Sequence, residues 1–171
     1  MKKNTMKKLL AAALSLALSL SLTACGGGKE EPAPTVPQPE PSYHNSVVEE
    51  LVNAGAFSEE LEELDIDTAY MLYKLADYGI PREELREAWA LRSAGATCEE
   101  VALLAFLHED DEQMSKVEQA MKDYVQSQID ANVDYRPNEI PKLEEAVVSR
   151  SGWTVLMLVA NDYKAAQEFL K

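Results

Sequence analysis

The spacing of apolar residues after position 45 predicts helices in the first part of the chain. Ser46 and Glu49 match the capping box that begins many helices, and the apolar edge that follows ends at Gly55. We therefore expect a helix near residues 46–54. A second stretch with helical spacing runs from about residue 61 to Gly79, with apolar or aromatic positions at Leu61, Leu64, Ala69, Leu72, Tyr73 and Ala76.

The middle of the chain gives conflicting local signals. Apolar and other residues alternate between positions 85 and 92, as in a strand, although most of these residue types prefer helix. Thr97 and Glu100 resemble another capping box, yet residues 101–107 form a continuous apolar run typical of a buried strand. Periodicity alone leaves both interpretations open for this region.

The last third of the chain carries clearer signals. Asp110 is suited to cap a long helix that extends to about Val133, with Gln113 at the reciprocal capping position. Two β-prone runs, residues 146–150 and 153–160, flank Ser151 and Gly152, which predicts a hairpin with a tight turn. Asn161 or Asp162 then caps a closing helix whose apolar positions are Ala165, Ala166, Phe169 and Leu170.

Several of these segments together resemble a known family. The similarity extends over most of residues 46–171. It is carried by residues 95–104 (GATCEEVALL), the acidic turn and long helix that follow, residues 140–144 (IPKLE), and the hairpin leading into residues 159–162. The family comprises small tethered bacterial lipoproteins, mostly from Gram-positive anaerobes, with a domain of unknown function. The resemblance implies strands at residues 87–93 and 100–107, and it transfers no functional residues. Ala105 and Leu107 depart from it, because relatives tend to carry lysines there.

With those strands included, we expect an α+β fold for residues 43–171. The sheet would have four strands, mainly antiparallel, in the order ββαββα after residue 86. It would pack against the long helix and the C-terminal helix, with the N-terminal helices at one side.

The N-terminus has the layout of an export signal. Four lysines precede an uncharged run from Leu9 to Leu22, which is short for a permanent membrane helix. The small residues before Cys25 complete a lipobox, formed by Leu22, Thr23, Ala24 and Cys25. Residues 1–24 are therefore predicted to be a cleaved signal peptide, with Cys25 carrying diacylglycerol and acyl chains such as palmitate. An ordinary cleaved signal with a chance cysteine is the alternative.

Residues 25–42 are predicted to tether the folded domain to the membrane. Three glycines follow Cys25, and five prolines then favour an extended polyproline conformation. The expected location is the extracytoplasmic face of the cell membrane, with the membrane reached through the lipid anchor. No other cofactor is expected.

The charge of the chain narrows the range of partners. Without the four lysines of residues 1–24, the chain keeps 12 of its 16 basic side chains against 30 acidic ones, a formal charge of −18. Such acidity argues against a nucleic-acid partner, because phosphates bind Lys and Arg. Cys98 is the one thiol that remains after lipidation, so we expect no internal disulfide.

The densest polar cluster is a weak candidate for cation binding. It consists of His108, Glu109, Asp110, Asp111 and Glu112. Oxygen ligands in a loop suit Ca²⁺, and the histidine suits a transition metal. The spacing of a calcium-binding loop is absent from the sequence, however, and no second histidine lies at ligand spacing. A helix cap is the simpler interpretation, and no metal site is predicted.

The remaining candidates for chemistry also have structural explanations. Cys98 lacks a nearby base in the sequence, so a structural cysteine is favoured over a nucleophile. A second acidic run favours a solvated helix face over a pair of glycosidase carboxylates; it comprises Glu59, Glu60, Glu62, Glu63, Asp65 and Asp67. The aromatic residues could line a ligand groove, although core positions are the commoner use; they are Trp89, Trp153, Tyr70, Tyr73 and Tyr78. No catalytic residues are predicted.

Three functions are consistent with this sequence. The favoured one is a non-enzymatic binding or accessory domain with a protein partner in the cell envelope, because no catalytic motif is found. The second is capture of a small ligand or cation for a membrane transporter. The third is a cell-envelope hydrolase that uses acidic residues.

Overall fold

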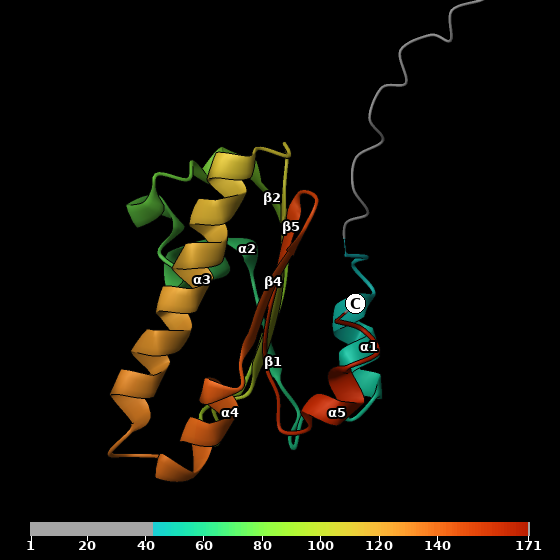
Figure 1. Cartoon of the computed structure of the whole chain (residues 1–171), viewed down its shortest axis with the longest axis vertical. Coiled ribbons are helices and arrows are strands. Elements are labelled where there is room, and N and C mark those ends of the chain that lie inside the picture. The colour runs from blue at the N-terminus through green and yellow to red at the C-terminus, as the bar shows by residue number, and fades with distance from the viewer. Residues whose placement is uncertain (1–42, 171) are drawn as a thin grey trace, which may run out of the picture. The chain divides into compact units, whose positions relative to one another are not determined.

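The computed structural model describes residues 43–170 (Figure 1). The predicted signal peptide, lipobox and tether lie outside the described residues. The described part is built on one five-stranded antiparallel sheet with the strand order β1-β2-β3-β5-β4. The strands are β1 (Glu62–Leu64), β2 (Leu85–Arg92), β3 (Glu100–Phe106), β4 (Val147–Ser151) and β5 (Thr154–Val159).

Helices cover both faces of the sheet, as Figure 1 shows. On one face lie α2 (Ile66–Leu72), α3 (Asp111–Asn132) and α4 (Ile140–Glu144), with three short 3-10 helices, η1 (Leu75–Tyr78), η2 (Arg82–Glu84) and η3 (Pro137–Glu139), in the connections. On the other face lie α1 (Val47–Asn53) and α5 (Tyr163–Ala166). Within residues 43–170 no helix has the length and apolar character that crossing a membrane requires.

The two-sided cover explains the continuous apolar runs in β3 and β5. Each face of the sheet carries its own hydrophobic core. Along β3, Ala102 and Leu104 pack in the core between the sheet and α3, whereas Val101 and Leu103 pack in the core between the sheet and α1. Side chains alternate between the faces of a strand, so burial of both faces removes the polar positions that would have shown a period of two. Every residue of β3 is buried, Ala105 included, and Leu107 just beyond the strand is exposed.

Several local predictions are confirmed. The long helix α3 ends close to the predicted Val133, and Asp110 caps it by accepting a hydrogen bond from the backbone N–H of Gln113. The hairpin β4–β5 turns at Gly152, whose φ of 54° lies in the left-handed region that favours glycine. Residues 85–92 and 100–106 are strands, as the family resemblance implied.

Other details of the prediction are wrong. The sheet has five strands, because Glu62–Leu64 pairs with β2 instead of beginning a helix. The C-terminal helix does not share a face with α3 but packs with α1 on the opposite face, and it is shorter than expected. Helix α1 forms where predicted, but Ser46 makes no side-chain cap hydrogen bond.

Candidate functional site

A carboxylate at the start of β3 lies buried between the sheet and the helices α2 and α3. Glu100 is 3% exposed, and both of its oxygens are bound. The hydroxyl of Tyr73, at the end of α2, donates to Oε1 at 2.7 Å, and the hydroxyl of Tyr124, on α3, donates to Oε2 at 2.7 Å. Arg92 of the neighbouring strand places its Nε 3.3 Å from Oε2. One side chain therefore joins two strands and two helices.

Burial changes the acidity of this group and its partners. Removal from water raises the pKa of Glu100 above its usual range, although the two tyrosine hydrogen bonds and Arg92 act in the opposite direction. Burial, followed by the nearby Glu100 carboxylate, raises the pKa of Tyr73 and of Tyr124. A glutamate with a raised pKa resembles a general acid. Here, however, the carboxyl is enclosed and fully hydrogen-bonded, which points to a structural role.

The preceding residue, Glu99, anchors a second polar cluster. Its side chain is completely buried and accepts hydrogen bonds from the backbone N–H of Ser58 at 2.7 Å and from the Ser58 hydroxyl at 2.5 Å. The Nζ atom of Lys142 lies 2.7 Å from Glu99 and 3.1 Å from Glu139. Burial lowers the pKa of Lys142, but hydrogen bonds to the two carboxylates outweigh burial and raise it overall. The ammonium group therefore stays charged between two acids.

Cys98 lies beside this cluster and is half-buried with a free thiol. Its backbone N–H donates to Glu139 at 3.0 Å, which holds the backbone in place. Burial raises the pKa of the thiol, and the nearby Arg136 only partly offsets that effect. Reactive cysteines depend on a lowered pKa, so this environment fits the structural role favoured from the sequence.

Residues 108–112, the weak candidates for cation binding, contact different partners. His108 lies 3.0 Å from Glu84, Asp111 pairs with Arg150 at 2.6 Å, and Glu112 pairs with Lys116 at 2.7 Å. Asp110 is occupied as the cap of α3. In the part of the chain that the structure describes, no group of three or more His, Cys, Asp or Glu side chains is arranged to hold a metal ion.

The second acidic run is divided among several elements and does not form a helix face. Glu59 accepts hydrogen bonds from Ser93 and Thr97, which lower its pKa and tie down the β2–β3 connection. Asp65 caps α2, and Asp67 pairs with Arg82. Of the remaining acids of the run, Glu63 on β1 lines a recess in the surface.

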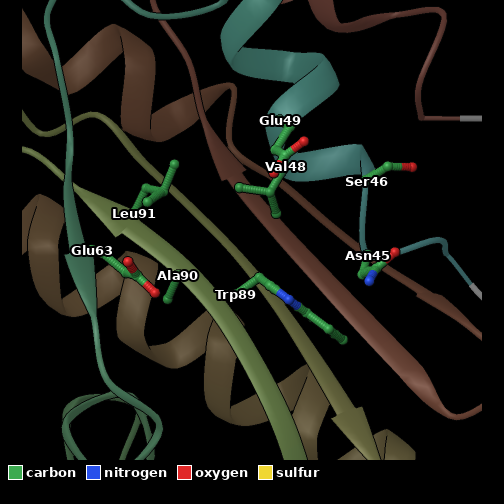
Figure 2. A pocket seen from close by; sticks show the side chains of 8 residues that line it. All are labelled: Asn45, Ser46, Val48, Glu49, Glu63, Trp89, Ala90 and Leu91. Atoms are coloured by element: carbon green, nitrogen blue, oxygen red, sulfur yellow. The ribbon is translucent and has the colours of Figure 1, made fainter.

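Glu63 and Trp89 help to line a recess of about 300 Å³ on the face that α1 covers only in part (Figure 2). Asn45, Ser46, Val48 and Glu49 contribute from the start of α1, and Ala90 and Leu91 contribute from β2. Glu63 is paired with Leu91 across the strands, so their side chains share the face on which Trp89 also lies. In Figure 2 the indole of Trp89 extends from β2 beneath Asn45. An aromatic wall and two exposed carboxylates thus meet at an open hollow.

A known protein family is similar to this chain over most of the described residues. The model of a family described as "Domain of unknown function (DUF4358)" matches residues 60–160. The chain belongs to this family. The DUF4358 match includes Glu99, Glu100, Trp89 and Glu63, whereas Glu49 on α1 precedes it. Searches of curated proteins and of solved structures found no match.

Sequence reasoning found some members of these sites and missed others. Trp89 and Glu63 are both among the candidates, but no local pattern places them together, because the helical spacing from residue 61 predicts a helix where β1 forms. Thr97 and Glu100 resemble a capping box, with a buried strand as the alternative, and no pattern marks Glu99 as a site residue. A usable signal was present: two acids open a seven-residue apolar run, and a buried carboxylate needs partners.

Proposed function

We propose that this DUF4358 protein is a lipid-anchored lipoprotein on the extracytoplasmic face of a bacterial membrane, and that its domain binds a partner without catalysing a reaction. The observation that carries the proposal is the lipobox at residues 22–25, followed by a proline-rich segment that leads directly to packed structure. The first described residue, Tyr43, donates its backbone N–H to Thr154 and its hydroxyl to Ser149.

The family resemblance supports this anchoring. It relates the chain to small tethered lipoproteins, mostly of Gram-positive anaerobes. Acylation of a single cysteine by two or three chains holds a protein on a bilayer durably, since each buried CH₂ contributes about 0.8 kcal/mol. The lipid, and not the acidic domain, would provide membrane attachment, because anionic lipid headgroups repel a domain of this charge.

The use of the buried charges supports a binding role over catalysis. The interior acids Glu99 and Glu100 are committed to tyrosine, serine, lysine and arginine partners that hold the fold together. The open recess at Trp89, in contrast, leaves polar groups facing solvent. Groups available for recognition therefore lie on the surface and not in a closed pocket.

The two cysteines allow a direct test of the anchor. Cells that express the full chain are grown with an alkyne analogue of palmitate, and the labelled protein is detected after membrane fractionation. We expect label on the wild type and on the Cys98→Ala variant, and loss of both label and mature size with Cys25→Ala. Label that persists in Cys25→Ala, or an unlabelled wild type, would refute lipidation at Cys25.

Cross-linking on intact cells tests the accessory role. The full tagged chain is compared with a chain that keeps residues 1–42 but carries an unrelated domain in place of residues 43–171. We expect one dominant envelope protein to cross-link only to the chain with the native domain. Identical cross-linked proteins for both chains would count against a partner of the domain.

Ligand capture for a membrane transporter is the second candidate function, and the Trp89 recess is the observation that favours it. Its volume of about 300 Å³ lies at the lower end of the range for small-molecule sites. Both functions place recognition on the same domain, and they differ in whether the ligand is a protein or a small molecule.

A further inference from the structure

We propose that the Trp89 recess binds the ammonium group of a small organic amine. The proposal rests on the binding role proposed above and specifies the ligand class. It combines three independent features of the recess: its volume, its aromatic wall and its carboxylates.

The first feature is the available indole. A cation over the face of a tryptophan is attracted by the negative face of the ring. Among the described residues, the cation that lies over an aromatic ring is Arg82, 5.9 Å from the centre of Tyr70. Within residues 43–170 no lysine or arginine lies over Trp89, which is half-buried at the wall of the recess. The ring is therefore held by the sheet while it remains accessible to a ligand.

The second feature is the pair of carboxylates that line the recess from different elements. Glu49 comes from α1 and Glu63 from β1, and Figure 2 shows them on either side of the hollow above β2. Neither forms an ion pair with a lysine, arginine or histidine of residues 43–170. Some other acids of this domain have such partners, for example Asp67 and Asp111.

These features select the chemistry of the ligand. Two carboxylates without an ion-pair partner among residues 43–170 disfavour an anion, whereas carboxylates and an indole face each attract an ammonium group. The apolar side chains of Val48 and Leu91 suit the alkyl part of such a ligand. A recess of about 300 Å³ fits a small alkylamine or diamine and is too small for a folded partner.

A matched pair of double variants separates this site from the general acidity of the chain. Glu49→Gln with Glu63→Gln removes both carboxylates of the recess. Glu50→Gln with Glu62→Gln removes the same charge from the same two elements, at adjacent positions that do not line the recess. All four glutamates are exposed, so we expect both variants to fold, which circular dichroism checks.

Tryptophan fluorescence measures binding of the amine, because the chain has only two tryptophans. The Trp153→Phe substitution is made in the full chain in detergent micelles, so that Trp89 reports alone. The probe is 1,5-diaminopentane at constant ionic strength, and 1,5-pentanediol is the neutral control. We expect a saturable change with the diamine and none with the diol. Affinity should fall about five- to tenfold in the Glu49/Glu63 variant and stay within twofold in the Glu50/Glu62 variant.

Two other results would overturn the proposal. An equal loss in both double variants would mean that the diamine responds to overall charge, and no saturable response would mean that the recess does not bind ammonium groups. In either case, a specific cross-linked envelope protein would leave the accessory function standing. If neither saturable diamine binding nor a specific cross-linked envelope protein is observed, the binding role itself is contradicted.

Discussion

The rings of Tyr73 and Tyr124 meet edge to face, with centroids 5.0 Å apart and planes inclined by 85°, and both hydroxyls end on Glu100. The edge-to-face contact joins the segment after α2 to the long helix α3, and the shared carboxylate joins both to β3. Aromatic pairs of this geometry contribute about 0.5–1.5 kcal/mol beyond their buried area. The arrangement therefore makes a polar group part of the core.

The Tyr73→Phe substitution tests the contribution of this arrangement to stability. It keeps the ring contact and removes one hydrogen bond to a buried carboxyl, so the free energy of unfolding should fall by about 1.5–3 kcal/mol. Urea denaturation measures the change. Tyr78→Phe is the control, because the Tyr78 hydroxyl donates to Asp123 at an exposed site and its loss should cost clearly less. Equal losses in the two variants would contradict a special role for Glu100.

The raised pKa of Glu100 predicts a pH dependence of stability. Between the usual glutamate pKa of about 4.3 and the higher value in the folded state, the native protein binds more protons than the unfolded chain. The contribution of Glu100 to stability therefore falls as pH rises through this window and becomes constant above it. The side chain of Glu100→Gln does not titrate, so it supplies the reference.

Denaturation of both proteins between pH 4 and 8 makes the comparison. The free energy of unfolding of the wild type minus that of Glu100→Gln should decrease with rising pH, by about 1.4 kcal/mol for each unit by which the pKa is raised. A difference that increases with pH would mean that Tyr73, Tyr124 and Arg92 outweigh burial and lower the pKa.

Removing the ammonium partner of the buried Glu99 should lower the free energy of unfolding more than removing the Tyr73 hydroxyl does. Lys142→Met leaves Glu99, which is fully buried, with Ser58 but without its ammonium partner, and broken buried pairs cost about 3–5 kcal/mol. Lys116→Met is the matched control, since its pair with Glu112 is exposed on one helix and is worth about 0.5 kcal/mol. Adding Glu99→Gln to Lys142→Met should restore part of the loss, and a double variant that is less stable still would contradict this account.

Local signals explain how much of the fold could be predicted. Helix α3 has a capping aspartate and one apolar face, and the β4–β5 hairpin has a glycine with positive φ between two β-prone runs. Both depend on neighbours in the sequence. In contrast, β1 carries two glutamates and a leucine with no strand preference, and its conformation follows from pairing with residues 90–92 of β2.

The candidate sites were less predictable for the same reason. Glu100 binds residues 27 and 24 positions away, and Glu63 meets Trp89 only because β1 adds to the edge of the sheet. Contacts between residues so far apart produce no periodic pattern in the sequence. The sequence identifies Glu63, Trp89 and Tyr73 as candidates but not Glu100 or Tyr124, because tertiary packing decides which acids and aromatics are buried and which are paired.

Cys98 provides a last prediction, on reactivity. Burial raises the pKa of its thiol, so less thiolate is present at neutral pH than for a free cysteine, and alkylation should be slow. In the Cys25→Ser chain Cys98 is the sole cysteine. Its rate of reaction with iodoacetamide should be at least about tenfold lower in the folded protein than in urea, and the midpoint of its pH profile should lie above the free-thiol pKa of about 8.5. A midpoint below that value would show an activated thiol and would reopen the case for chemistry at Cys98.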